Sequence, residues 1–225
     1  MLGVCAVALA GGIAGCGGSS SSGGSDNGVA AKSPDAIVNA ATNAVNAVKT
    51  VHVSGSLRSG GSPITLDLTL VAGKGGGGQM TQSGLSFKLI NLNQTVYING
   101  SDDFWRHIGG TSAAQLFHGK WLRASANGQF AAVASLTTVQ TLFNQLLSNH
   151  GKLAKGPTTT VAGRKVVAVN DTTKGGTLYI ATTGQPYPVQ VSKKGSDGGR
   201  VVFDRYNQPA SLTAPPNAID VSKLR

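Results

Sequence analysis

Charged side chains are scarce in this chain of 225 residues, at 12% where an ordinary soluble domain has roughly 25%. Acids are especially few, because 9 Asp and Glu stand against 19 Lys and Arg, which leaves a net charge of +10. A basic surplus favours anionic partners, either lipid headgroups or nucleic acid, and does not choose between them. Hydrophobic residues, at 40%, suffice for a sizeable core in one domain or two, which argues against wholesale disorder.

Cysteine and long apolar runs are also nearly absent. No run reaches the roughly 20 residues of a membrane-spanning helix, but residues 4–10 have the length of a signal-peptide core. They precede Ile13-Ala14-Gly15-Cys16, which resembles the bacterial lipobox, whose cysteine thiol receives diacylglycerol. We therefore predict that residues 1–15 are a signal peptide, cleaved before Cys16, and that Cys16 is lipidated.

The predicted cleavage fixes the location and the redox state of the mature protein. Two acyl chains on Cys16 suffice for stable anchoring, so we expect the protein at the outer face of the cytoplasmic membrane. The other cysteine, Cys5, is removed with the signal peptide, which leaves a domain without disulfides. Met1 and Leu2 lack the positive charge with which signal peptides begin, so the true start codon is expected further upstream.

Low-complexity sequence separates the predicted anchor from the rest of the chain. Residues 17–28 are almost wholly Gly, Ser, Asp and Asn, a composition that cannot bury enough apolar surface to fold. We expect residues 16–32 to form the lipidated end and a flexible tether, and residues 33–225 to form one monomeric domain.

Hydrophobic periodicity predicts an α+β fold for this domain. Ser33, Pro34 and Asp35 supply an N-cap, a first-turn proline and a first-turn acid for one helix, and the apolar stripe of residues 130–150 predicts another helical region. Between these two regions and after the second one, hydrophobic residues recur at every second position, so we expect short strands joined by Gly-rich turns. Adjacent short strands predict one large curved antiparallel sheet, a half-barrel, with the helices packed on one face.

Three segments are predicted to be turns or loops from their composition. Residues 75–78 are four consecutive glycines, and Asn99-Gly100 is a strong tight-turn signal. Asp102-Asp103 is expected to begin a loop after that turn, because adjacent residues of an extended chain point to opposite faces and do not form an acid pair.

No residue pattern predicts an active site. His52, His107, His118 and His150 lie on different elements without metal-ligand spacing, so we expect them at the surface or in turns. The Gly-x-Ser-x-Gly motif is missing, and the glycines at 73–78 lead into a strand and not into a phosphate-binding helix. The basic residues lack interleaved aromatics, and export would remove nucleic acid from reach. We therefore predict a non-enzyme without cofactor, metal or nucleic acid.

Several short phrases, taken in order, resemble one protein family. With the lipobox, the N-terminal helix, the strand order and the central helices, they resemble the LolA-like superfamily, in particular the LppX, LprA, LprF and LprG lipoproteins of actinobacteria. The resemblance covers most of residues 33–222. It implies a curved half-barrel with an apolar cavity for acyl chains, which carries or displays lipid or lipoglycan in the cell envelope. A membrane transporter is a further candidate partner. The phrases are Val96-Tyr97-Ile98-Asn99-Gly100, Gly119-Lys120-Trp121-Leu122, Leu178-Tyr179-Ile180, Gly184-Gln185-Pro186-Tyr187-Pro188 and Pro215-Pro216-Asn217-Ala218-Ile219-Asp220.

The apolar stripes of the strands and of the central helix allow two interpretations. They either close a filled core, which suits a non-carrier interaction or sensing module of the envelope, or they line a cavity that holds acyl chains. Periodicity does not distinguish a filled core from a hollow one, and the family resemblance favours the cavity. The candidate lipid-binding residues are Leu66, Leu68, Leu70, Leu142, Phe143, Leu146, Leu147, Val189 and Val191.

Overall fold

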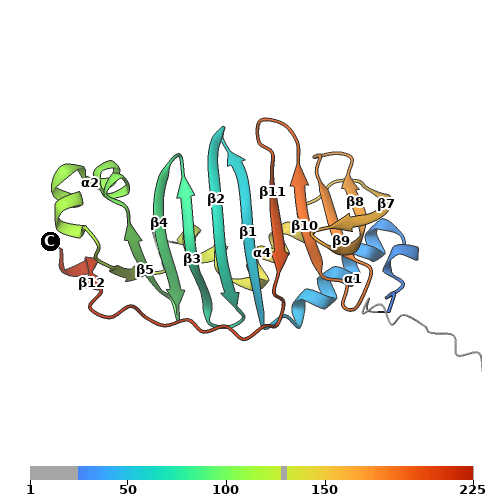
Figure 1. Cartoon of the computed structure of the whole chain (residues 1–225), viewed down its shortest axis with the longest axis horizontal. Helices are drawn as coiled ribbons and strands as arrows, with labels where there is room; N and C mark the ends of the chain where they lie inside the picture. Colours follow the sequence, from blue (N-terminus) through green and yellow to red (C-terminus); the bar gives the residue numbers. More distant parts are fainter. Residues whose placement is uncertain (1–24, 128–130, 225) are drawn as a thin grey trace, which may run out of the picture.

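One large sheet organises the chain. A computed structural model describes residues 25–127 and 131–224 (Figure 1). The strands in this part are β1 (Thr50–Ser59), β2 (Ser62–Val71), β3 (Gly75–Gln82), β4 (Leu85–Leu92), β5 (Thr95–Gly100), β6 (Leu122–Ser125), β7 (Leu153–Val161), β8 (Arg164–Asp171), β9 (Thr177–Ala181), β10 (Pro188–Lys193), β11 (Gly199–Asp204) and β12 (Ile219–Asp220). They form a twelve-stranded sheet in the order β12-β6-β5-β4-β3-β2-β1-β11-β10-β9-β8-β7, antiparallel apart from the parallel β12–β6 pair.

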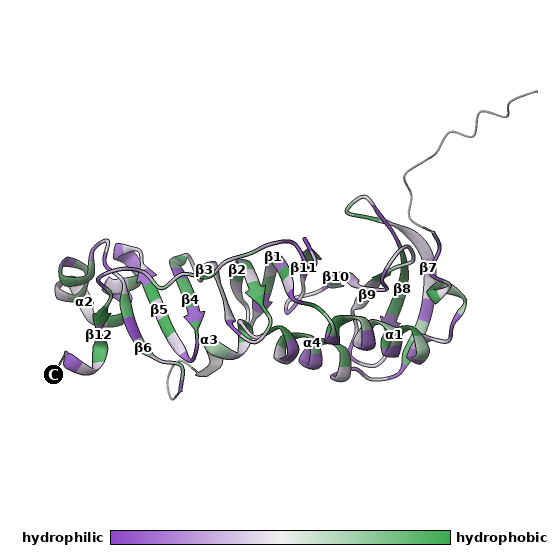
Figure 2. Ribbon diagram, turned by 90° about the horizontal axis from the view of Figure 1, so that it is seen from below, coloured by the Kyte–Doolittle hydropathy of each residue, from purple (hydrophilic) through white to green (hydrophobic). Residues whose placement is uncertain are grey.

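Helices line one face of this sheet and close one of its ends. α1 (Pro34–Asn46), α3 (Ala131–Leu136) and α4 (Val139–Ser148) lie along the same face (Figure 2). α2 (Asp102–Phe117) contacts β4 and β5, near the end of the sheet at which β12 and β6 lie. We call the face that the helices line the inner face and the opposite one the outer face. The predicted fold class, α+β with a large curved antiparallel sheet, is confirmed.

The N-terminal helix begins where its sequence predicts. Ser33 is its N-cap, with a side-chain oxygen that accepts a hydrogen bond from the Ala36 N–H, and Pro34 occupies the first turn. Its buried residues recur at three- and four-residue spacing and face α4, β7 and β8; they are Ile37, Val38, Ala41, Ala44 and Val45.

The core lies between the helices and the inner face of the sheet. Leu70 is paired with Val51 across β2 and β1, and both side chains are fully buried. Phe143 of α4 packs on Phe203 of β11 with ring centroids 5.3 Å apart. The middle of the sheet and the central helix are therefore joined by close packing.

The glycines at 75–78 lie inside β3, and the predicted turn is wrong. A Cβ on Gly76 would lie 2.6 Å from Leu70 Cδ2 and 3.0 Å from the Thr137 carbonyl oxygen. The connection between α3 and α4 therefore packs directly on this strand, because no side chain separates them. Glycine occurs both in turns and where another segment packs closely on the backbone, and composition alone does not distinguish these two cases.

The predicted Asn99-Gly100 turn and the loop at Asp102-Asp103 are also wrong, because β5 runs through Gly100 and α2 begins directly after it. Ser101 caps α2, with a side-chain oxygen that accepts from the Phe104 N–H at 3.2 Å, and the two aspartates occupy the positive end of the helix. The helix is interrupted at residues 109 and 110, two glycines with non-helical backbone angles. That interruption hid the helical period in the sequence.

The folded domain starts before residue 33, so the predicted tether is too long at its C-terminal end. The Asn27 N–H donates to the Thr182 carbonyl oxygen at 2.9 Å, and its side-chain amide donates to the Ala181 carbonyl oxygen at 3.0 Å. Val29, in the short 3-10 helix η1 (Val29–Ala31), is buried. The predicted signal peptide and Cys16 lie outside the described residues.

Candidate functional site

A pocket of about 210 Å³ lies between α4, α1 and the inner face of β7 to β10, and we call it the α4 pocket. Val191 is paired with Leu178, and Leu178 with Val169, so these three lining residues form one row across β10, β9 and β8. Leu146 and Leu147 line the pocket from the helix side. The full aliphatic lining is Val38, Leu146, Leu147, Leu153, Val169, Leu178 and Val191.

Polar groups form the rim of the α4 pocket. They come from the end of α4, from the connection to β7 and from the turn between β8 and β9, where the chain is half-buried or exposed. His150 Nδ1 lies 2.9 Å from the Gly151 carbonyl oxygen, so in the neutral ring this nitrogen carries the proton and donates it. The rim residues are Gln145, Asn149, His150, Asp171, Gly175, Gly176 and Thr177.

Asp171 is the acid of the rim, and backbone amides occupy both of its oxygens. Oδ1 accepts from the N–H groups of Lys174 and Thr173 at 2.8 and 2.9 Å, and Oδ2 accepts from the Gly151 N–H at 2.9 Å. These hydrogen bonds, that of Lys174 above all, hold the pKa of the carboxyl below its ordinary value of 3.8. Asp171 therefore remains ionised at neutral pH and closes the turn that forms the rim.

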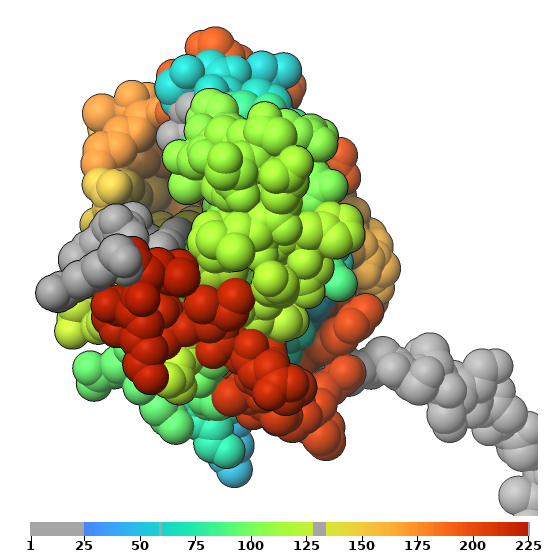
Figure 3. All heavy atoms as spheres, turned by 90° about the vertical axis from the view of Figure 1, so that its left-hand side faces the viewer, coloured from blue at the N-terminus to red at the C-terminus, as the bar shows by residue number. Residues whose placement is uncertain are grey.

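A second apolar pocket, of about 220 Å³, lies at the opposite end of the sheet, and we call it the α2 pocket. At this end α2 and the C-terminal segment lie side by side (Figure 3). Trp105 lines the pocket, and in the described part of the chain its buried indole N–H has no hydrogen-bond partner. Arg123, the charged residue of the lining, pairs with Asp220 at 3.2 Å. The other lining residues are Val96, Ile98, Phe104, Ile108, Leu122, Ala124 and Val221.

Close packing separates the two pockets. Leu68 and Leu70 on β2, with Phe143 on α4, are at most 3% exposed, and all three belong to the same buried cluster. Among the described residues, the middle of the inner face is therefore filled between the α4 pocket and the α2 pocket.

The candidate residues are distributed among three environments. Leu146, Leu147 and Val191 line the α4 pocket, and the register of β8 to β10 brings them together. Leu68, Leu70 and Phe143 belong to the filled middle, and Leu66 and Leu142 are half-buried against it. Leu178 and Val169 also line the α4 pocket. Their strands, β9 and β8, show the same period of two as β10, so the pattern that pointed to Val191 could also have pointed to them.

Val189 lies apart from the α4 pocket. It packs with Val166 and Ala181 in a small separate cluster. A β-bulge between Pro188 and Gln190 shifts the register against β9, so Val189 and Val191 do not share a face as strict alternation requires. Its assignment as a residue of the helix-side cavity is therefore corrected by the structure.

His52 is buried on the outer face, where the sequence predicted a surface or turn position. Its Nδ1 lies 2.6 Å from Asp204 Oδ1, and its Nε2 lies 3.0 Å from Asp67 Oδ1. The two aspartates come from β11 and β2, which flank β1 in the sheet. The sequence contained no signal for this contact, because the three residues come together only through strand pairing.

The described fold resembles that of solved mycobacterial proteins. LprF from Mycobacterium bovis superposes with a TM-score of 0.58 at 11% sequence identity, over 81% of this chain and 96% of that chain. The lipoprotein LppX from Mycobacterium tuberculosis gives a TM-score of 0.53 at 15% identity, over 80% of this chain and 98% of that chain. At these identities the likeness is one of fold, and at that level it confirms the resemblance drawn from the sequence.

Comparison of sequences adds no closer relation. No protein-family model matches the chain, and no curated protein matches it. Within residues 25–127 and 131–224, no helix is both long enough and apolar enough to cross a membrane.

Proposed function

We propose that this protein is a membrane-anchored lipoprotein of the cell envelope that binds the acyl chains of a lipid or lipoglycan and does not catalyse a reaction. The observation that carries this proposal is the α4 pocket, whose aliphatic floor and polar rim match the two parts of an amphiphilic ligand. Burial of an acyl chain against this aliphatic floor is favourable, because it removes apolar surface of both the chain and the pocket from water. The LppX-like fold supports the same conclusion, because the LolA-like resemblance implies acyl-chain binding between sheet and helices.

The size of the α4 pocket limits what it holds in the described conformation. A cavity of about 150 Å³ accommodates benzene, so the 210 Å³ of the α4 pocket corresponds to roughly eight carbons of an acyl chain. At about 0.8 kcal/mol for each buried methylene, such a segment contributes about 6 kcal/mol before the cost of ordering the chain. A longer chain would extend beyond the pocket or displace α4 from the sheet.

The predicted anchor would lie near this pocket. Residues 26–31 contact the β8–β9 end of the sheet, where Lys155 Nζ also donates to the Ala30 carbonyl oxygen at 3.2 Å. The α4 pocket is built from the same strands. A lipid on Cys16 would therefore hold the domain to the membrane by the end that carries the α4 pocket, within reach of lipids of that membrane.

A second candidate function is a non-carrier interaction or sensing module, and the filled middle of the inner face favours it. Phe143, Leu70 and Phe203 are buried between the α4 pocket and the α2 pocket, and the rings of Phe143 and Phe203 pack with centroids 5.3 Å apart. In this alternative both pockets are packing defects, and a partner protein binds elsewhere on the domain.

Lipid retention separates the two candidates. The full chain with Cys16→Ala, purified without detergent, should carry a lipid that native mass spectrometry detects as added mass and that solvent extraction releases. A Cys16→Ala chain that is free of lipid after this purification, and that does not take up added phospholipid, contradicts lipid binding and supports the interaction module.

A further inference from the structure

The basic surplus is concentrated at the end of the sheet that carries the α4 pocket. Residues 149–200, which run from the end of α4 through β10 to the first two residues of β11, hold eight Lys and Arg against two Asp. The remaining described residues hold ten against seven. Most of the net charge therefore belongs to about a quarter of the chain.

Two lysines of this region flank the rim of the pocket. Lys174 Nζ donates to Asn149 Oδ1 at 2.6 Å, and Asn149 is a rim residue. Lys193 lies against the rim glycines, since its Cε is 3.9 Å from the Cβ position of Gly175 and its Cβ is 3.8 Å from that of Gly176. Both lysines are exposed. Their ammonium groups can thus reach a polar group held at the mouth of the pocket.

Lysines outnumber acids at this rim within the described structure, because the charge of Asp171 offsets only part of the charge of Lys174 and Lys193. Asp171 is the one acid of the pocket lining, and its oxygens already accept three backbone N–H bonds. The ion pairs found among the described residues all involve His or Arg, so no lysine there pairs with a carboxylate. Lys174 and Lys193 therefore remain available to a ligand anion.

We propose that the α4 pocket selects lipids with an anionic phosphate headgroup, which Lys174 and Lys193 bind at the rim while the acyl chain occupies the aliphatic floor. The proposal rests on lipid binding by this pocket and adds the class of headgroup. A lysine near an anionic headgroup strengthens binding about fivefold, so the two together account for roughly 30-fold.

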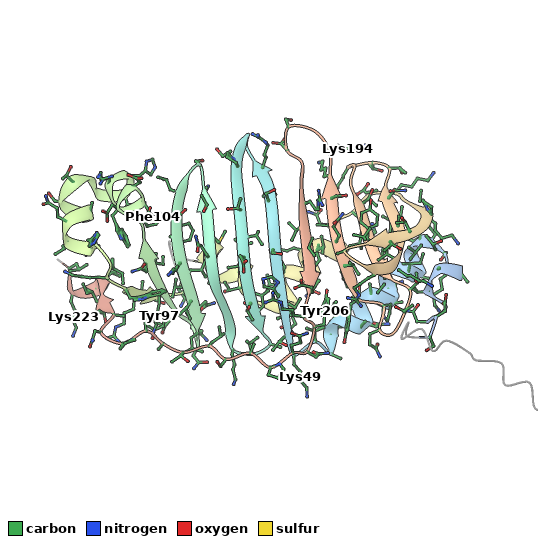
Figure 4. The ribbon with its side chains drawn as sticks, viewed as in Figure 1. Lys49, Tyr97, Phe104, Lys194, Tyr206 and Lys223 are labelled. Atoms are coloured by element: carbon green, nitrogen blue, oxygen red, sulfur yellow. The ribbon has the colours of Figure 1, made fainter. Side chains whose placement is uncertain are left out.

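The experiment measures the affinity of the Cys16→Ala chain for two monomeric probes by isothermal titration calorimetry. Dihexanoyl phosphatidylglycerol is anionic, and dihexanoyl phosphatidylcholine has the same chains on a zwitterionic headgroup. Inorganic phosphate is titrated as a third probe, because free phosphate shares the chemistry of the headgroup. The test variant is Lys174→Ala with Lys193→Ala. The charge-matched control is Lys194→Ala with Lys223→Ala, whose lysines lie at the β10–β11 loop and at the far end of the sheet (Figure 4).

The proposal predicts that the starting protein and the control bind phosphatidylglycerol roughly 30-fold more tightly than phosphatidylcholine. The Lys174→Ala/Lys193→Ala variant should lose this preference and keep its affinity for phosphatidylcholine. Equal binding of the two lipids by the starting protein overturns the headgroup assignment but leaves lipid binding intact. Failure to bind either lipid overturns the proposed function itself. Phosphate that binds as tightly as phosphatidylglycerol makes this an anion site without lipid selectivity, which also overturns the proposal.

Discussion

A substitution that fills the α4 pocket tests directly whether this pocket binds an acyl chain. Leu146 lines the pocket from α4 and is half-buried, so Leu146→Trp extends a larger side chain into existing space. If the indole occupies about half of the 210 Å³, it excludes about four methylenes of a bound chain. At about 0.8 kcal/mol each, that loss is about 3 kcal/mol, or roughly a 150-fold weaker affinity.

The assay is calorimetric titration of the Cys16→Ala chain with 1-octanol, whose chain matches the estimated capacity of the pocket. The control is Asn144→Trp, which places the same side chain on an exposed position of α4 outside the pocket lining. We expect octanol affinity to fall in Leu146→Trp alone, while the melting temperatures of both variants stay close to that of the starting protein. Unchanged octanol affinity in a folded Leu146→Trp variant would refute the assignment of the pocket. A parallel loss in Asn144→Trp would show that the effect does not arise inside it.

Three further predictions concern the anchor, the packing of β3 and the acid stability of the rim. Cys16→Ala, expressed from a start that restores a charged n-region, should leave the membrane fraction and lose acyl mass; a variant that stays lipidated and membrane-bound contradicts the lipobox assignment. Gly76→Ala should destabilise the fold by about 1–3 kcal/mol, because its Cβ meets Leu70 and the Thr137 carbonyl. Calorimetry should then show a melting temperature lower by several degrees, and an unchanged value would mean that α3 and α4 do not pack on β3. Asp171 has a lowered pKa in the fold, so its contribution to stability is complete above about pH 4 and is lost as the pH falls through that lowered value. Asp171→Asn should accordingly melt below the starting protein at pH 6, and the difference should shrink as the pH falls below 3.8, whereas a pH-independent difference would contradict the role of the carboxylate.

Local signals in the sequence predict the architecture well where neighbouring residues determine structure. Ser33, Pro34 and Asp35 mark the start of α1, and the alternation of Leu66, Leu68 and Leu70 identifies β2 and its inner face. The errors occur where one residue type serves two purposes. Glycines 75–78 have the composition of a turn but lie in β3, where Gly76 allows the α3–α4 connection to approach the sheet. The glycines at 109 and 110 conceal a helix.

The candidate site could be predicted only in part, because pockets depend on contacts between distant segments. Leu146, Leu147 and Val191 were identified as apolar positions, but their meeting with Val38 and Leu153 depends on how α1 and α4 sit on the sheet. The β-bulge that removes Val189 from this site depends on strand pairing, and so do the contacts of His52. The hydrophobic periodicity of a single segment does not predict that the inner face has a filled middle and a pocket towards each end.

The most direct test of lipid binding in the α4 pocket is a crystal structure of the protein purified from its own membrane without lipid exchange. Binding at the α4 pocket predicts continuous acyl-chain density between Leu146 on α4 and Val191 on β10, with the headgroup at the rim near Lys174 and Lys193. An α4 pocket without density, with a lipid found in the α2 pocket or nowhere on the domain, would contradict it.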